Sequence, residues 1–548
     1  MSRSASPHSD SHDRFDPAPH REQLVAIVRA IESLDAVDEA AIDRILRQHP
    51  RGGTGFFSRA ELIAGFRHFA PVEDFASPEE TFVRRLLMRP VRSQSGVTPL
   101  TVLTKPFPCP GRCIFCPNDV RMPKSYLSAE PGAQRAANNR FDPYLQAWNR
   151  LEAYRAIGHP TDKIELIVLG GTWSFYPEAY QVGFIAGCFR ALNDFGEGID
   201  RREEAASVLD LETLPADVDG RHATAGDYNR RIQGWAGTET SEGEASTWEQ
   251  LEALQRANEE ARCRSVGLSL ETRPDHVTPA ETLRLRRLGA TKVQVGIQSL
   301  SDEVLSVNQR GHDVATTRRA LHWLRAAGFK LHAHWMPNLL GATPESDIRD
   351  FERLMEDPGF CPDELKIYPC SLIESAELMQ YYERGEWKPY EHEELLRVVS
   401  SVVGRAPRWS RLTRVIRDIS SDDIVAGNKF TNFRELAEKE LARQGGAPVD
   451  IRAREVRGQV VDASELSLQK TEYASSLGRE IFFEFTTPDD RLAAFLRLAL
   501  PGAGAEGIPE EVIGAAMIRE VHVYGGALDL GHRREGAAQH RGLGRTLI

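Results

Sequence analysis

Three cysteines lie close together in the stretch CPGRCIFCP, as Cys109, Cys113 and Cys116. With seven cysteines in 548 residues, the spacing C-x-x-x-C-x-x-C would arise by chance in about one chain in a thousand. Structural zinc takes four protein ligands, commonly as two separated pairs, and no C-x-x-C or H-x-x-x-H pair follows at zinc-finger spacing. The pattern therefore favours an iron–sulfur cluster over zinc or buried thiols.

A [4Fe–4S] cluster held by three thiolates has one iron without a protein ligand. That iron is open to a cofactor, and the three-cysteine spacing is the signature of radical S-adenosylmethionine (SAM) enzymes, in which the open iron binds the amino and carboxylate groups of SAM. We therefore predict that Cys109, Cys113 and Cys116 bind a [4Fe–4S] cluster and that SAM is a cofactor. Zinc is the alternative.

Short apolar runs alternate with amphipathic helical stretches along the middle of the chain. Strands are predicted at 100–104, 164–170, 265–271, 292–297, 330–336 and 364–368, and helices at 144–157, 279–288, 314–327 and 345–356. Six strands in βα repeats indicate a parallel sheet, so the predicted fold class is α/β with a partial (β/α)6 barrel of the TIM-like type. The cysteine loop follows the first strand, at the carboxyl ends where the chemistry of barrels lies.

Four further residues lie where the predicted strands end. Gly170 and Gly171 follow the second strand, where a radical-SAM barrel brings its backbone close to the methionine end of SAM. Glu271 and Gln298 end the third and fourth strands, which would aim their side chains into the barrel mouth. All four are candidate SAM contacts, although strand-end glycines and solvated polar residues are common in loops without such a role.

The composition limits the class of protein, its compartment and the kind of nucleic-acid site that the chain can have. The chain is 41% hydrophobic and 27% charged, a globular composition long enough for two or three domains. Its first 20 residues are polar, with no signal peptide or membrane anchor, and no apolar run could span a bilayer, so we expect a cytoplasmic protein with a disordered tail. The net charge of −12 requires any nucleic-acid site to be a local basic patch. The acidic insert 196–262 is predicted to be a surface excursion without assigned chemistry.

Longer stretches carry a more specific signal. They include TVLTKPFPCPGRCIFCPNDVRMPKSYLSAEPGAQRA, RFDPYLQAWNRLEAYRAIGHPTDKIELIVLGGTW, GLSLETRPD, VQVGIQS, HWMPNLLG, DELKIYP, REVHVYGGALDL and QHRGLG. In these stretches the chain resembles the catalytic subunit of Elongator in its bacterial and archaeal single-chain form. The resemblance covers nearly the whole chain from about residue 80, apart from the insert.

The resemblance implies a radical-SAM barrel joined to an α+β acetyl-CoA domain of the GNAT type, and modification of the wobble uridine of tRNA. In the chemistry proposed for the family, SAM is cleaved to a 5′-deoxyadenosyl radical, which takes hydrogen from the methyl group of acetyl-CoA. The resulting carbon radical adds to C5 of uridine 34, and hydrolysis leaves 5-carboxymethyluridine. A radical cofactor suits this target because C5 of uracil is a poor site for ordinary acyl transfer.

The resemblance also implies residues for acetyl-CoA. Lys163 matches a lysine that the family associates with acetyl-CoA, and we expect a catalytic role for it. The residues Glu520, Val521, His522 and Val523 match the strand that pairs with the pantetheine arm, and Gln539, Gly542, Leu543, Gly544 and Arg545 match part of the pyrophosphate loop. A zinc site found in eukaryotic members has no cysteines at 450–456 here, so no zinc is expected.

The expected domains are a disordered tail at 1–20, a helical region at 21–80 that could touch tRNA, the barrel at 81–405, a linker region at 406–460 and a GNAT-type domain at 461–548. The family's GNAT domain continues beyond the glycine loop to a tyrosine-bearing strand and helix, whereas this sequence stops at Ile548. We therefore expect that domain to be incomplete at its C-terminus, with a poorly ordered end that binds acetyl-CoA weakly.

Two arginine runs are candidate tRNA contacts. The first includes Arg84, Arg85, Arg89 and Arg92, and the second includes Arg411, Arg414 and Arg417 with Trp409 available for stacking on a base. Protein lysine acetylation with a structural cluster is the alternative activity, and a catalytically impaired tRNA-binding protein is the alternative role. A homodimer is left open, and no partner subunit is indicated.

Overall fold

The computed structural model describes residues 15–34, 38–52, 55–87, 96–208, 224–235, 240–457, 459, 461–502, 507, 509–525 and 542–548. The chain divides into two compact units: Met1–Arg92 with Leu151–Thr161, and Ser93–Arg150 with Asp162–Ile548. Within the described residues, no helix combines the length and the apolar character needed to cross a membrane.

The first unit is a small helical domain. Its elements are η1 (Ala18–His20), α1 (Arg21–Glu32), α2 (Glu39–Gln48), α3 (Arg59–Phe69) and α4 (Glu79–Leu86). Helix α3 begins at a capping box in which Ser58 and Glu61 each bond the other's backbone amide. The apolar faces of the helices meet in one core that includes Leu24, Phe66 and Phe82. Helices therefore form where the sequence predicted them, whereas residues 1–14 of the predicted tail lie outside the described residues.

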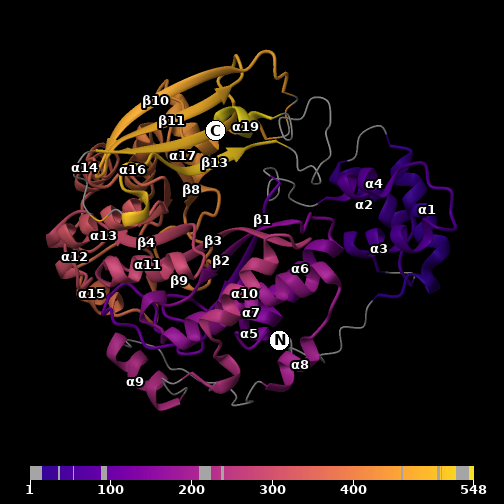
Figure 1. The fold of residues 1–548 in the computed structure, drawn as a ribbon, viewed down its shortest axis with the longest axis horizontal. Helices are drawn as coiled ribbons and strands as arrows, with labels where there is room; N and C mark the ends of the chain where they lie inside the picture. Colours follow the sequence, from indigo (N-terminus) through magenta and orange to yellow (C-terminus); the bar gives the residue numbers. More distant parts are fainter. Residues whose placement is uncertain are drawn as a thin grey trace. The chain divides into compact units, whose positions relative to one another are not determined.

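The second unit is built on a seven-stranded parallel sheet that curves into a half-barrel (Figure 1). Its strands, in spatial order, are β1 (Thr98–Leu103), β2 (Lys163–Leu169), β3 (Arg264–Thr272), β4 (Lys292–Gln298), β5 (Lys330–Trp335), β6 (Glu364–Ile367) and β8 (Arg411–Val415). All six predicted strands form within two residues of their predicted bounds. The seventh, β8, lies in the stretch predicted to be a linker, where its arginines obscure the alternation of a strand.

Helices lie in the segments that connect the strands (Figure 1). They are α5 (Pro131–Asn138), α6 (Pro143–Ala156), α7 (Glu178–Glu197), α8 (Arg202–Val208), α9 (Ala225–Trp235), α10 (Trp248–Asn258), α11 (Pro279–Arg287), α12 (Asp302–Val307), α13 (Val314–Ala326), α14 (Pro344–Glu356), α15 (Leu378–Glu383) and α16 (His392–Arg405), with the short turns η3 (Trp173–Phe175), η4 (Glu242–Glu244) and η5 (Pro274–His276). Side-chain caps at Thr278, Asp313 and Thr343 start α11, α13 and α14. The predicted insert thus contains helices α8, α9 and α10.

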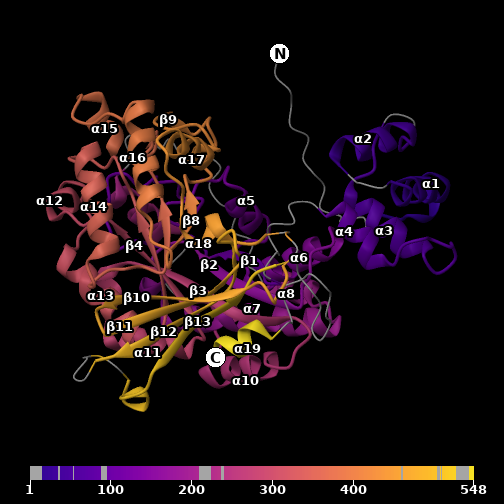
Figure 2. The same cartoon turned by 90° about the horizontal axis from the view of Figure 1, so that it is seen from above.

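A four-stranded antiparallel sheet forms the C-terminal part of this unit (Figure 2). Its strands are β10 (Ser467–Ser475), β11 (Gly478–Thr486), β12 (Leu492–Pro501) and β13 (Met517–Val523), followed by α19 (Leu543–Leu547). Between the two sheets in sequence lie β9 (Ile424–Ala426), which pairs with β7 (Leu372–Ile373), and helices α17 (Phe433–Arg443) and α18 (Ile451–Arg454); η6 (Glu510–Val512) precedes β13. The α/β class and the barrel followed by an α+β domain are confirmed.

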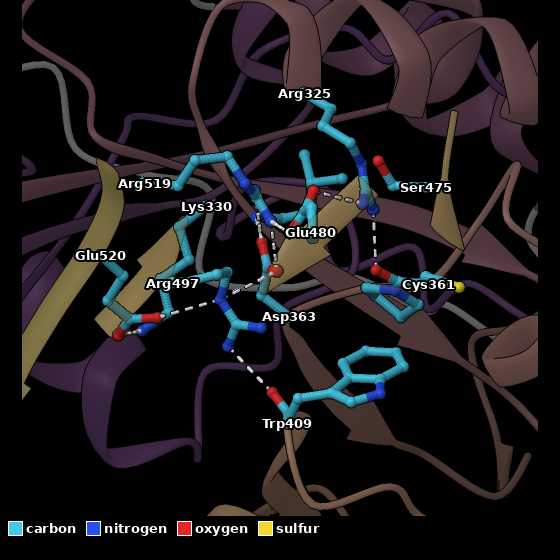
Figure 3. A network of polar contacts seen from close by, with 12 residues as sticks. Arg325, Lys330, Cys361, Asp363, Trp409, Ser475, Glu480, Arg497, Arg519 and Glu520 are labelled. Atoms are coloured by element: carbon cyan, nitrogen blue, oxygen red, sulfur yellow. Dashed lines mark hydrogen bonds and ion pairs between the residues drawn. The ribbon is translucent and has the colours of Figure 1, made fainter. Parts of the chain in front are cut away.

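A buried network of charges joins the two sheets (Figure 3). Asp363, just before β6, accepts hydrogen bonds of 2.8 and 2.5 Å from Arg519 of β13 and lies 3.2 Å from Nε of Arg497 of β12. Arg325 of α13 donates to Glu480 of β11 at 2.8 Å. Burial alone would raise the pKa of Asp363, but the surrounding guanidinium groups hold it below its ordinary value. The antiparallel sheet is therefore held against the barrel by buried, mutually compensating charges.

A bulge in β13 makes this network possible. The register of β12 and β13 shifts so that Arg497 pairs with Glu520 and the next β12 residue pairs with Ile518. Arg519 is thus the extra residue, and it can face the barrel together with its neighbour Glu520. Glu520 in turn forms a 2.5 Å ion pair with Lys330, the first residue of β5. The antiparallel sheet therefore contacts the amino-terminal edge of the barrel sheet.

Candidate functional site

The three cysteines lie on the long loop that leaves the carboxyl end of β1. The backbone amide of Cys116 donates to the carbonyl of Cys113 at 3.2 Å, so the last two cysteines share one tight turn. Cys109 has its Sγ 3.9 Å from Oγ1 of Thr172, which follows β2. As predicted, the loop lies at the carboxyl edge of the sheet.

Two arginines from distant parts of the sequence meet at Cys113. Arg310, between α12 and α13, has Nη1 3.0 Å from the sulfur, and Arg273, just after β3, has Nη1 3.5 Å from it. A hydrogen bond from the Cys116 thiol, together with these guanidinium groups, holds the pKa of Cys113 well below its ordinary value. The position therefore favours a buried thiolate, the form in which cysteine binds metal.

A glycine in the cysteine motif leaves room for one of these arginines. A Cβ atom on Gly111 would lie 2.1 Å from Nη1 of Arg273, too close for any side chain. The motif CPGRC therefore needs glycine at this position so that the guanidinium group can reach the loop.

The chemistry of the cysteine site can be tested against a cluster. Three thiols lie on one loop, with Cys113 buried and Cys109 and Cys116 partly exposed. In a [4Fe–4S] cluster held by three cysteines, each thiolate binds a different iron and the fourth iron stays open. Two guanidinium groups beside Cys113 would offset the negative charge that a thiolate-ligated cluster brings. The residues present therefore fit a cluster.

Gly170 has a structural reason to be glycine in addition to the predicted SAM contact. Its φ is +141°, and a Cβ atom there would lie 1.9 Å from Oγ1 of Thr104 and 3.2 Å from the Thr104 amide nitrogen. At Gly171 a Cβ atom would approach the hydroxyl of Tyr176 to 3.1 Å. The end of β2 is thus packed tightly against the end of β1, immediately beside the cysteine loop.

Glu271 and Gln298 both lie at the carboxyl edge, as predicted. Glu271 is largely buried, its Oε1 lies 3.7 Å from Nδ1 of His334, and burial raises its pKa. Gln298 has a left-handed φ of +66°, and its amide folds back over Gly296, whose carbonyl accepts from Arg310 at 2.6 Å. Gln298 therefore lies beside the arginine that contacts Cys113. Oε2 of Glu271 and Oε1 of Gln298 are buried without hydrogen-bond partners in the described part of the chain.

Polar side chains that the sequence analysis missed line the interior of the half-barrel below Glu271. Lys366 of β6 donates to Oε1 of Gln294 on β4 at 2.5 Å, and Nε2 of His334 lies 3.0 Å from the same oxygen. Burial lowers the pKa of Lys366 to about 8 and keeps the pKa of His334 well below its ordinary value. Period-two alternation places these residues on the inner face, but only the curvature of the half-barrel makes that face a polar interior.

Lys163 is not brought to the cysteines. It is the first residue of β2 and pairs with Arg264, so it lies at the amino edge of the sheet. Seven residues at about 3.3 Å each separate the two ends of the strand by roughly 20 Å. Lys163 is therefore on the edge that the antiparallel sheet contacts, opposite the edge that carries the cysteines.

Strand β13 and helix α19 bring most of the predicted acetyl-CoA residues together. Helix α19 packs on β12 and β13, and a Cβ atom on Gly544 would lie 3.5 Å from Val523 and 3.8 Å from Val521. The prediction of a poorly ordered end is wrong for Leu543–Leu547, because packing on the sheet stabilises a helix that is too short to form alone. Gln539 lies outside the described residues.

The side chains of Glu520 and His522 point into the molecule. Glu520 is paired with Lys330, and the ring of His522 stacks on Phe495 of β12, where burial lowers its pKa to about 4. Contacts of these two positions with a coenzyme would therefore come from the backbone of β13, an edge strand among the described residues.

Known proteins match this chain over nearly its full length. Residues 233–356 match the Radical SAM superfamily and residues 362–443 match the Radical_SAM C-terminal domain. The tRNA uridine(34) acetyltransferase of Dehalococcoides mccartyi is 36% identical over 464 residues, covering 83% of this chain and 89% of the relative. Elongator complex protein 3 of Homo sapiens is 30% identical over 481 residues, covering 85% of this chain and 78% of that protein.

The chain belongs to the Elongator protein 3 family. Its fold agrees with that of the Methanocaldococcus infernus Elp3 solved with an N-terminal deletion, at a TM-score of 0.62 and 32% identity over 83% of this chain and 89% of that one. With its match to the Radical SAM superfamily, this member of the Elongator protein 3 family is a radical SAM enzyme.

In this family member, most of the predicted tRNA-contacting arginines of the second run have partners within the chain. Arg411 forms a 2.7 Å ion pair with Glu455, and Arg417 forms one of 2.7 Å with Glu130. Arg414 is 46% exposed, and its partner Asp418 is more exposed still. Arg414 is therefore the member of the run best placed to meet a phosphate. Trp409 cannot stack on a base as predicted, because it is buried and stacks on Tyr473 with ring centres 4.3 Å apart.

The first arginine run belongs to the helical unit. Arg85 donates to the carbonyls of Ile31 and Leu34 at 3.0 and 3.1 Å, at the C-terminal end of helix α1. Arg84 is 43% exposed and pairs with Glu80 one turn earlier. Arg89 and Arg92 lie outside the described residues.

Proposed function

We propose that this chain modifies the wobble uridine, uridine 34, of tRNA, and that it uses a [4Fe–4S] cluster, SAM and acetyl-CoA to form 5-carboxymethyluridine. The proposal rests on one observation. At the carboxyl edge of the half-barrel, the three-cysteine loop lies against Arg273 and Arg310, with Gln298 beside them. The names of the curated relatives, tRNA uridine(34) acetyltransferase and Elongator complex protein 3, support the substrate.

Each group of residues has a proposed role. Cys109, Cys113 and Cys116 would hold the cluster, and Arg310 would offset the charge of the Cys113 thiolate from 3.0 Å. When bound, the cluster and SAM would supply one-electron chemistry able to attack an unactivated C–H bond. Tight packing at Gly170 and the position of Gln298 shape the wall beside the cysteine loop, where SAM would lie.

Acetyl-CoA would bind at the other edge of the barrel sheet. Lys163 and the backbone of β13 lie on that edge, and α19 packs against β13 there. Because Lys163 lies roughly 20 Å from the carboxyl end of its strand, we assign it to holding acetyl-CoA and not to SAM cleavage.

Product formation tests the proposal. The chain, reconstituted anaerobically with iron and sulfide, is incubated with tRNA, SAM, acetyl-CoA and a reductant, and the nucleosides are analysed by mass spectrometry. We expect carboxymethyluridine only when all three substrates are present, and none with Cys113→Ala. Cys188→Ala is the matched control, since Cys188 is buried in α7 away from the loop. Release of CoA with a peptide alone, without tRNA or SAM, would instead indicate a lysine acetyltransferase.

A further inference from the structure

The acidic insert, for which the sequence suggested no chemistry, reaches back to the cysteine loop. Asn229 of helix α9 accepts a hydrogen bond of 2.9 Å from the backbone amide of Cys109 through Oδ1. Its Nδ2 donates to the carbonyl of the same cysteine at 2.8 Å. Both backbone polar groups of one predicted cluster ligand are thus bonded by a single side chain that is 120 residues away in sequence.

The residue beside Asn229 holds the other end of the loop. Tyr228 is buried, and its hydroxyl donates to the carbonyl of Met122 at 2.9 Å. Its ring packs with Val120 and Ile232. Two adjacent residues of α9 therefore contact the loop at its first cysteine and beyond its last, at the two ends of the 14-residue segment from Cys109 to Met122.

A second contact from the insert lies just before Cys109. Both carboxylate oxygens of Glu244, in η4, lie 2.7 Å from Nζ of Lys105. The Lys105 and Glu244 side chains are 21% and 28% exposed, so this ion pair is partly shielded from solvent. The chain entering the cysteine loop is thus held by the insert at two places.

The other two cysteines are held by the barrel itself. The sulfur of Cys113 contacts the guanidinium groups of Arg310 and Arg273. The backbone of the next residue, Ile114, donates to the Asn308 carbonyl at 3.3 Å and accepts from the Leu378 amide at 2.8 Å. None of these contacts involves the insert. Cys109 also approaches the barrel through its Sγ, 3.9 Å from Oγ1 of Thr172, but its backbone N–H and C=O are bonded by α9.

We propose that Asn229 is a positioning residue for the metal centre, which fixes Cys109 at the distance from Cys113 and Cys116 that the cluster requires. The side chain suits this task because a carboxamide carries an acceptor oxygen for the N–H and a donor nitrogen for the C=O on two adjacent atoms. Aspartate keeps the acceptor and loses the donor, and alanine loses both. The inference rests on the proposed function, because it assumes that the three cysteines hold a cluster.

Cluster retention tests this inference without an activity assay. Wild type, Asn229→Ala and Asn229→Asp are reconstituted anaerobically, iron and sulfide per chain are measured, and bleaching of the iron–sulfur absorbance is followed after addition of a chelator. With two hydrogen bonds removed, Asn229→Ala should lose its cluster about tenfold faster than wild type. Asn229→Asp should fall between the two, and the electron paramagnetic resonance spectrum of the reduced cluster should broaden in both variants.

The matched control is Gln233→Ala, because Gln233 lies on the same helix with an exposed side chain. It should retain the cluster as wild type does, and circular dichroism should show all variants folded. Equal bleaching rates for wild type and Asn229→Ala would overturn the inference and leave the proposed function intact. If Asn229→Ala does not fold, Tyr228→Phe replaces it in the test, because that change removes only the hydrogen bond to Met122. The Tyr228→Phe variant should bleach faster than wild type. Bleaching of this variant at the wild-type rate would overturn the inference. If wild type binds no iron, both proposals fail.

Discussion

At Gly170, packing and cofactor binding make different predictions. A Cβ atom there would lie 1.9 Å from Oγ1 of Thr104, and the φ of +141° is one that only glycine adopts readily. If Gly170 served only SAM binding, replacing it would hardly change the stability of the protein without cofactors. If packing requires glycine there, replacing it lowers the stability even when no cofactor is bound.

We therefore expect Gly170→Ala to lower the free energy of unfolding by roughly 2–5 kcal/mol, through strained backbone and overpacking. Urea denaturation without cofactors measures this. Gly234→Ala is the control, because no atom lies within 4 Å of its Cβ position in α9, and it should gain up to about 1 kcal/mol. Wild-type stability of Gly170→Ala, with only SAM binding lost, would contradict the packing explanation.

At the scale of elements, the antiparallel sheet and the half-barrel meet through charges, and these charges hold one another in place (Figure 3). Asp363 is fully buried and lies between Arg519 and Arg497. It also accepts from the backbone amide of Leu331, the second residue of β5. One carboxylate thus joins two strands of the antiparallel sheet to the amino edge of the barrel.

Asp363→Asn keeps the shape of the side chain and leaves both guanidinium groups without their main counter-charge. Removing one partner of a buried ion pair typically costs about 3–5 kcal/mol, so we expect a loss of that size. The measurements are the urea midpoint and the rate of trypsin cleavage within β10–β13. Glu435→Gln is the control, since its pair with Lys439 is exposed and screened by solvent and should leave the urea midpoint unchanged. Equal midpoints for Asp363→Asn and this control would refute the prediction.

At the scale of the whole molecule, the net charge is −12, so tRNA must bind through a local basic surface. Several arginines that look available in the sequence serve the fold instead, as the ion pairs of Arg411 and Arg417 show. Arg414 is 46% exposed and contacts Tyr368 and the exposed Asp418.

We expect Arg414→Ala to weaken tRNA binding and to reduce the slope of log affinity against log salt by about one, the value for one lost phosphate contact. Filter binding of tRNA across a series of salt concentrations measures this slope. Arg349→Ala on α14, an exposed arginine of the barrel, serves as the control and should leave the slope unchanged. An unchanged slope for Arg414→Ala would show that this arginine of β8 does not contact a tRNA phosphate.

The sequence by itself determined the order of strands and helices, because burial on one face leaves a period of two or 3.6 that can be read locally. The spacing of Cys109, Cys113 and Cys116 likewise lies within eight residues and needs no fold to be recognised. The strand β8 was not predicted because two of its five residues are arginines, which form ion pairs and so replace the usual apolar pattern.

Tertiary structure alone decided what surrounds the cysteines. Arg310 and Asn229 reach the loop from 197 and 120 residues away, and nothing in their neighbouring residues distinguishes them from solvated side chains. It also separated Lys163 from the cysteines, because the two ends of one strand face opposite edges of a parallel sheet. A local sequence pattern shows which face of an element is buried. The partners of a side chain depend instead on which strands and loops the half-barrel brings together.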